Sequence, residues 1–281
     1  MKVALNLLFL GLLTLLSLSS SSCDKKESEV RRPEEFMKSF SVALKDSKLD
    51  ALWNAFPPSY RADLTQIVHE DFPKIHPDVW NDVLSMGKNL ELLLTERREM
   101  LLNSILVVQN SQLKKLIEEQ GDATAQLLAK LRQGSLARPG DWSQLDVPSF
   151  VAGDLSQALG LVMLWAREII PQFGSAFDQL ANNRTIILKE EPDRILARVE
   201  ADGAAPQEQF FVKVENTWIL QSFTLSWEKG LNELRESLTA LGDPKSVVGQ
   251  SIAKRAQAFE ELAQAPDTQA FDTLFVKLLG E

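Results

Sequence analysis

The stretch RTIILKEEPDRILARVE, residues 184–200, decides the fold class of this chain. Apolar and polar residues alternate with a period of two on both sides of Glu191-Pro192-Asp193, which is typical of β-strands. Proline at the second position of a four-residue segment favours a tight turn. The stretch therefore predicts a hairpin, and it marks the point where helical spacing of apolar residues gives way to strand spacing.

A second pair of strands is predicted directly downstream. EQFFVKVEN (208–216) and TWILQSFTL (217–225) carry the same alternation, and the link at Asn216-Thr217 is short. Consecutive strands with short links pair antiparallel. We therefore expect a four-stranded antiparallel meander over about 184–225.

The third strand indicates how the sheet is covered. Phe210, Val212 and Val214 share one face, whereas Phe211 and Lys213 lie on the other. The first set is wholly apolar and the second is mixed. We expect the Phe210 face to be buried under helices and the Phe211 face to be mixed in character.

The rest of the chain has apolar residues at helical spacing, over 33–183 and again over 226–281. The segment Pro77–Gln120 has no internal proline and one glycine, which predicts one long helix or two helices joined near Asn110-Ser111, with Gly121 as the C-terminal cap. The fold class is therefore α+β, mainly helical, with one four-stranded meander packed on helices. We expect 33–281 to form one compact domain.

The N-terminus has the residue pattern of an export signal. Lys2 precedes a strongly apolar run, four serines follow, and then comes Cys23, the only cysteine in the chain. A cationic start, an apolar core and small residues before a cleavage point are the parts of a signal peptide, predicted here over 1–22. The charged segment 23–32 is then expected to be a disordered tether.

The position of Cys23 resembles the lipidation site of bacterial lipoproteins, although Ser20 stands where that family usually has Leu. The resemblance implies acylation of Cys23, export, and anchoring in a bacterial membrane, with Asp24 indicating the inner membrane. Two alternatives are an ordinary signal peptide cleaved among the serines, which leaves Cys23 a free thiol, and an uncleaved anchor. Acyl chains supply the membrane affinity in the lipidated case.

Charge narrows the partners of the mature chain. The net charge is −9, and removal of Lys2 with the leader makes it −10. Nucleic-acid binding depends on Lys and Arg that neutralise phosphates, so the acidic balance argues against a nucleic-acid partner. The expected partners are the membrane, through the lipid anchor, and an unknown protein or small molecule.

Two further segments resemble NTF2-like lipoproteins. PEEFMKSFSVALKDSKLDALWNAFPPSY (33–60) resembles the opening helices of that family, and EQFFVKVENTWILQSF (208–223) resembles its paired strands. The resemblance implies a curved sheet wrapped around helices to form a cone with a pocket. The helical residues between the two segments and the helices at the end are not expected in that fold.

Candidate sites are few. His69, Glu70, Asp71 and His76 are the one cluster of histidines and carboxylates, but the two imidazoles are separated by Pro73, so we expect surface histidines and no metal site. We interpret Glu96-Arg97-Arg98-Glu99 as a solvated helix face. No cofactor fingerprint, phosphate loop or nucleophile elbow is present, and no catalytic residue is assigned.

Trp142 is the candidate contact for a partner or ligand. It lies in a Gly- and Pro-containing loop among polar neighbours, and an exposed loop aromatic is a typical anchor. The alternative is that its ring packs back onto the domain. The other tryptophans follow apolar stripes and are expected in the core.

These observations predict a non-enzymatic binding or interaction module in the cell envelope. One alternative is an envelope enzyme whose pocket lies inside an NTF2-like cone, which predicts a closed cavity with an acidic or imidazole group at its base. A second alternative is a structural spacer, supported by the long helix expected over Pro77–Gln120.

Overall fold

The computed structural model describes residues 32–169, 182–201 and 203–280. Contacts within the chain group these residues into two compact units. The helical unit comprises His69–Leu145 and 235–280, and the sheet unit comprises 32–68 and the described parts of Asp146–Leu234. The α+β class predicted from the sequence is confirmed, whereas the single compact domain expected over 33–281 stays a prediction.

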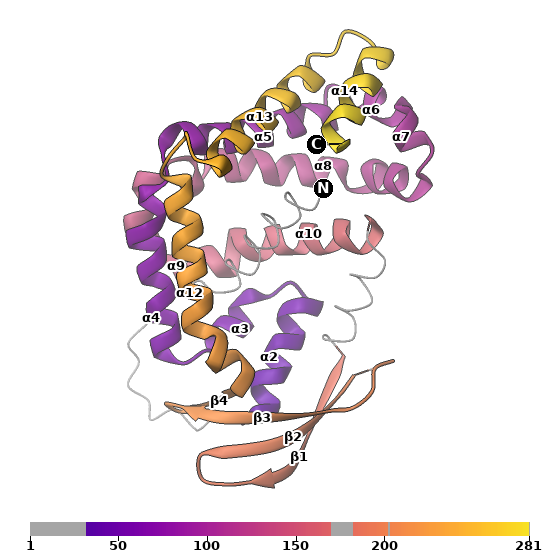
Figure 1. Ribbon diagram of the computed structural model, residues 1–281. Helices are drawn as coiled ribbons and strands as arrows, with labels where there is room; N and C mark the ends of the chain where they lie inside the picture. Colours follow the sequence, from indigo (N-terminus) through magenta and orange to yellow (C-terminus); the bar gives the residue numbers. More distant parts are fainter. Residues whose placement is uncertain (1–31, 170–181, 202, 281) are drawn as a thin grey trace. The chain divides into compact units, whose positions relative to one another are not determined.

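The sheet is the predicted antiparallel meander. Its strands are β1 (Asn183–Glu190), β2 (Arg194–Ala201), β3 (Gln207–Val214) and β4 (Thr217–Leu220). They follow one another in the order β1-β2-β3-β4 (Figure 1). A bulge interrupts the β1–β2 register between Ile187 and Lys189.

The face of the sheet that we expected to be buried is the wrong one. Phe211 is 0% exposed and is paired with Ile195, which is also fully buried, whereas Phe210 is 39% exposed. Because α2 (Pro33–Lys45) contacts both β1 and β4, it covers the Phe211 face. The alternation was read correctly, but only the position of α2 decides which side of the pleat is inside.

The fourth strand ends earlier than predicted. It stops at Leu220, and α12 (Gln221–Leu241) begins at the next residue instead of near 226. In a helix, Phe223 and Trp227 are one turn apart and share a face. Phe223 stacks on Phe56 with ring centroids 5.6 Å apart, and Trp227 stacks on Tyr60 at 4.1 Å. An extended chain would not bring Phe223 and Trp227 together in this cluster.

The remaining elements of the sheet unit are helical. They are α3 (Leu49–Ala55), α4 (Pro58–Gln66), α9 (Val147–Phe150), the π-helical turn η5 (Val151–Leu155) and α10 (Ser156–Ile169). Pro33 and Pro58 stand at the first positions of α2 and α4, where the missing N–H costs no hydrogen bond. A further π-helical turn, η1 (Ile67–Asp71), follows α4.

The helical unit is built around three long helices. α5 (Pro77–Leu94) packs against α8 (Ser111–Gln133) and α13 (Val247–Ala263) (Figure 1). α14 (Thr268–Gly280) packs on α13 and contacts the short helices α6 (Arg98–Asn103) and α7 (Ile105–Val108). Short 3₁₀ turns η2 (Phe72–Lys74), η3 (Ser135–Ala137) and η4 (Pro139–Gln144) complete it.

Pro77–Gln120 does not form one long helix; the predicted junction at Asn110-Ser111 is confirmed, but the segment before it is divided further. It breaks after Leu94, at Ser104 and before Ser111, where the Asn110 side chain caps α8 by accepting a hydrogen bond from the Leu113 N–H at 3.0 Å. Gly121, expected to be a cap, lies inside α8. The spacer hypothesis therefore loses the feature that supported it.

By length and composition, the helical stretch Val147–Arg167 is apolar enough to cross a membrane, with a mean hydropathy of 1.4. Its Leu155, Leu159 and Met163 side chains are buried in the sheet unit. A buried core helix meets the same criterion, so this stretch is weak support for a span.

Candidate functional site

Trp142 is not an exposed anchor; its ring packs back onto the protein, as the alternative given above predicts. Its side chain is 2% exposed, and its ring lies against Phe72 and Trp80 with centroids 4.6 and 4.9 Å apart. The loop is η4, whose packing on η2 holds the tryptophan inside the helical unit. The interpretation as a surface contact is wrong because the polar neighbours of Trp142 in sequence are not its neighbours in space.

The two histidines are not brought together. His69 Nε2 lies 3.0 Å from the Leu145 carbonyl, whereas His76 caps α5, its Nδ1 accepting from the Asp78 N–H at 3.2 Å. Asp71 pairs with Lys74 at 2.7 Å and lies 3.5 Å from Arg235. Among the residues described, no group of three or more metal-ligating side chains converges.

The charge run on the helical unit is only partly a solvated face. Glu96 and Glu99 are exposed, but the Arg98 side chain is 24% exposed and lies against α8. Its guanidinium pairs with Asp122 at 2.7 Å and donates to the carbonyls of Ile117 and Glu118. Arg98 therefore fastens α6 to α8.

Cys23, the predicted lipid attachment site, lies outside the described residues, as do the leader 1–22, most of the tether 23–32 and part of the helical region 33–183. The assignments made for them stay predictions. The described chain begins at Arg32, the last residue of that predicted tether.

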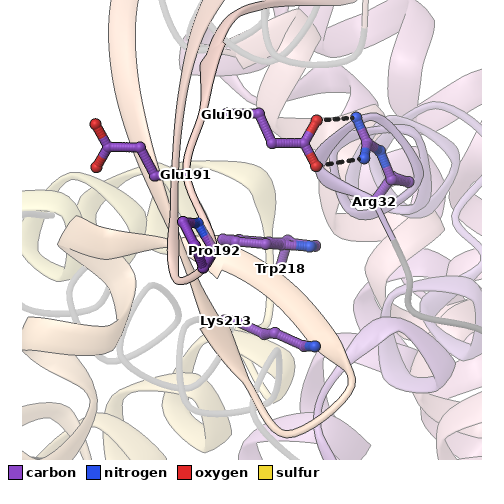
Figure 2. A pocket seen from close by; sticks show the side chains of 6 residues that line it. All are labelled: Arg32, Glu190, Glu191, Pro192, Lys213 and Trp218. Carbon is purple, nitrogen blue, oxygen red and sulfur yellow. Dashed lines mark hydrogen bonds and ion pairs between the residues drawn. The ribbon is translucent and has the colours of Figure 1, made fainter.

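An open pocket of about 490 Å³ lies directly at this residue (Figure 2). It is formed where the N-terminal end of α2 meets the sheet, near the β1–β2 turn and the β3–β4 hairpin. Its lining residues are Arg32, Glu190, Glu191, Pro192, Lys213 and Trp218.

Strand register explains why three of these side chains converge. Lys213 and Trp218 are directly opposite each other in the β3–β4 hairpin, and they share the inner face with Phe211, two residues before Lys213. Glu190 is paired with Ile195, which is paired with Phe211, so it lies on the same face. In the middle of the sheet the side chains of this face are buried, and at the edge of the sheet they line the pocket.

Arg32 and Glu190 form a bidentate ion pair across the mouth of the pocket. The Arg32 Nη1 and Nη2 atoms donate to the two carboxylate oxygens of Glu190 at 2.8 and 3.0 Å. The hydrogen bond that Arg32 donates to Glu190 raises the pKa of Arg32, so the guanidinium stays charged. Both side chains are more than two-fifths exposed, and an exposed pair of this kind contributes at most about 1 kcal/mol to stability.

Lys213 has a different position. Figure 2 shows its side chain extending to the same side as Trp218 and the Arg32–Glu190 pair. Within the part of the chain that the structure describes, Lys213 takes part in no ion pair, and its side chain is exposed. Its ammonium group is therefore available to a ligand.

Glu191 contributes little to the pocket's interior. Its carboxylate points away from Arg32 in Figure 2 and pairs with Lys189. The hydrogen bond and charge of Lys189 lower the pKa of Glu191. Pro192 and the largely buried Trp218 supply the apolar part of the lining.

Sequence reasoning missed this pocket, although part of it was within reach. A two-residue turn at Glu215-Asn216 puts Lys213 opposite Trp218, but we expected the turn one residue later. Glu215 has a φ of 53°, which is uncommon for a residue other than glycine. A glutamate at this position therefore does not indicate a turn in the sequence. Arg32 and Glu190 are 158 residues apart, so no pattern of neighbouring residues predicts that they form an ion pair.

The comparisons with known proteins give no relative from which a role for this pocket could be transferred. No family model, no curated protein and no solved structure matches the chain.

Proposed function

We propose that this protein is an exported bacterial lipoprotein, anchored through Cys23, that acts as a non-enzymatic binding module in the cell envelope. The observation that carries the binding role is the open pocket at Arg32, Glu190, Lys213 and Trp218. A pocket that combines an apolar wall with a few converging charged groups is the usual form of a small-ligand site. The resemblance to NTF2-like lipoproteins stays part of this proposal.

The state of the sheet favours binding over catalysis. An enzyme of the cone type requires an empty cavity against the sheet with an acid or imidazole at its base. Here Ile195, Ala197 and Phe211 are 0% exposed on that face. The carboxylate on the pocket side, Glu190, is exposed to solvent and paired with Arg32, which makes it a poor general acid or base.

The proposed anchor places the pocket near the membrane. Only residues 24–31 separate Cys23 from Arg32, and a fully extended chain of this length spans about 30 Å. A ligand of this pocket would therefore be met close to the bilayer surface.

The anchoring half is tested by cell fractionation of the full chain. Wild-type protein should sediment with membranes and be released by detergent, and Cys23→Ala should move to the soluble exported fraction. Ser22→Ala, which leaves the cysteine, is the matched control and should behave as wild type. A Cys23→Ala protein that remains in the membrane pellet although mass spectrometry shows its leader removed contradicts acylation as the anchor.

The binding half is tested on purified full-length protein with a panel of phosphorylated, carboxylated, saccharide and peptide ligands. We expect saturable binding of one class, with the ligand recovered chemically unchanged. Product that accumulates in proportion to the amount of protein would replace the binding proposal with an enzyme. Saturable binding of a class without a phosphate would leave the binding module standing.

A further inference from the structure

The pocket has a positive balance of charge in a protein that is acidic overall. On the side that Figure 2 shows facing Arg32, two cations, Arg32 and Lys213, stand against one carboxylate, Glu190. Glu191 turns to the opposite side and is paired with Lys189. The lining side chains that face Arg32 therefore carry a surplus of one positive charge, whereas the whole chain carries −9. Glu34 is not part of the lining, but its carboxylate also lies 4.0 Å from the Arg32 Nε atom, so Lys213 is the cation of this pocket without an ion-pair partner among the described residues.

We propose that this pocket binds a phosphate group, with the Lys213 ammonium as its main contact. The inference rests on the proposed binding function and deepens it by naming the ligand chemistry. Both terminal nitrogens of Arg32 are occupied by Glu190, so the fork that would recognise a carboxylate is already filled. Lysine is a point charge, and such a charge suits a tetrahedral phosphate without requiring a planar partner.

The apolar wall limits what is attached to the phosphate. Pro192 and Trp218 line the pocket beside Lys213, and the volume of about 490 Å³ accommodates a group larger than a free ion. The ligand is thus a phosphate ester with a compact body, such as a glycerol or sugar unit. Two sources offer this chemistry near a membrane anchor: the headgroup of an anionic phospholipid and a soluble phosphate ester.

The first arm of the test measures a soluble ester. Full-length protein purified in detergent is dialysed to equilibrium against radiolabelled glycerol 3-phosphate. Lys213→Gln should weaken binding by about tenfold, because a hydrogen bond to a charged group is lost. Lys229→Gln removes the same charge from an exposed position on α12 outside the pocket and should leave the affinity unchanged.

A second variant should change the phosphate affinity in the opposite direction. Glu190→Gln removes the carboxylate that occupies both terminal nitrogens of Arg32, while the Nε atom keeps its 4.0 Å contact with Glu34, so phosphate affinity should rise by several-fold. A purely structural role for the Arg32–Glu190 pair would instead leave the affinity the same or lower it. Opposite effects of Lys213→Gln and Glu190→Gln are therefore the expected signature.

The second arm measures a lipid source. Cys23→Ala protein from which the leader 1–22 has been removed, and which therefore lacks the proposed anchor, is mixed with vesicles of one part phosphatidylglycerol to three parts phosphatidylcholine, and with vesicles of phosphatidylcholine alone. If the protein binds the vesicles that contain phosphatidylglycerol and Lys213→Gln abolishes this binding, the ligand is a lipid headgroup. If the protein binds glycerol 3-phosphate but neither kind of vesicle, the ligand is a soluble ester. Absence of both, or equal behaviour of Lys213→Gln and Lys229→Gln, overturns the inference.

Discussion

Trp142 and Arg98 stand in polar stretches of the sequence, yet both side chains make their decisive contacts inside the helical unit. Trp142 lies between aromatic rings from η2 and α5, and its neighbour Trp80 donates its indole N–H to the Leu136 carbonyl at 2.7 Å. Arg98 donates to the backbone of α8. In both cases the partner is distant in sequence, so the polar neighbours in the chain led us to predict an exposed side chain where the structure has a packed one.

Tyr60 provides a test of burial at the scale of one residue. Its phenol is 7% exposed and stacks on Trp227, and this burial raises its pKa from the usual 10.0, although a hydrogen bond with Thr224 opposes the shift. It is the only tyrosine in the chain, so absorbance near 295 nm during an alkaline titration reports this residue alone. We expect a midpoint above 10 in the folded protein and at about 10 in urea.

The sign of the linked effect follows from the direction of the shift. Because folding favours the neutral phenol, its contribution to stability is complete below the unfolded pKa and is lost as pH rises through the folded pKa. Tyr60→Phe should therefore show a smaller loss of stability between pH 10 and 12 than the wild type. A folded-state midpoint at or below the value in urea would contradict the burial of Tyr60.

At the scale of elements, two glycines in helices differ in how closely the neighbouring chain packs against them. Gly121 lies inside α8, and a Cβ there would meet Leu94 and the Arg98 guanidinium at 3.6–3.7 Å, which is ordinary contact. Gly249 lies in the first turn of α13, where a Cβ would approach the Asp243 carbonyl oxygen to 2.8 Å. The first site has room for a methyl group and the second does not.

The same substitution should therefore have opposite effects at the two sites. Gly121→Ala should stabilise the protein by about 0.5–1 kcal/mol, because alanine loses less backbone entropy than glycine in a helix interior. Gly249→Ala should destabilise it by about 1–3 kcal/mol through overpacking against backbone. Urea unfolding of both variants gives the comparison, and changes of the same sign would show that the packing of α8 or α13 differs from that described.

At the scale of the whole molecule, neither unit is one continuous piece of chain. The chain passes between the units at 68/69, 145/146 and 234/235, so each unit is assembled from separated segments. In the helical unit, α5 is covered both by α8, from the middle of the sequence, and by α13, from the end. The C-terminal helices are therefore part of the helical unit's core and not an appendage.

Deletion of 243–281 tests this organisation. The deletion removes α13 and α14 and uncovers one side of α5, while every described segment of the sheet unit remains. We expect hydrogen exchange to show lost protection in α5 and α8 and retained protection in β1–β3. The full chain, measured in parallel, is the reference.

Loss of protection throughout the sheet as well would contradict independent units. That outcome would instead support the single compact domain expected from the sequence over 33–281. Retained protection in α5 and α8 would show that α13 is dispensable to the helical unit. Each result thus decides between cooperative and separate folding of the two units.

The sequence by itself determined the period of most segments, and with it the α+β class and the antiparallel meander, because these depend on residues that are neighbours in the chain. Only the tertiary structure decided that Phe211 and not Phe210 is inside, that Trp142 is buried, and that Arg32 meets Glu190 beside Lys213. These outcomes depend on contacts between residues far apart in sequence, and such contacts leave no trace in local pattern or spacing.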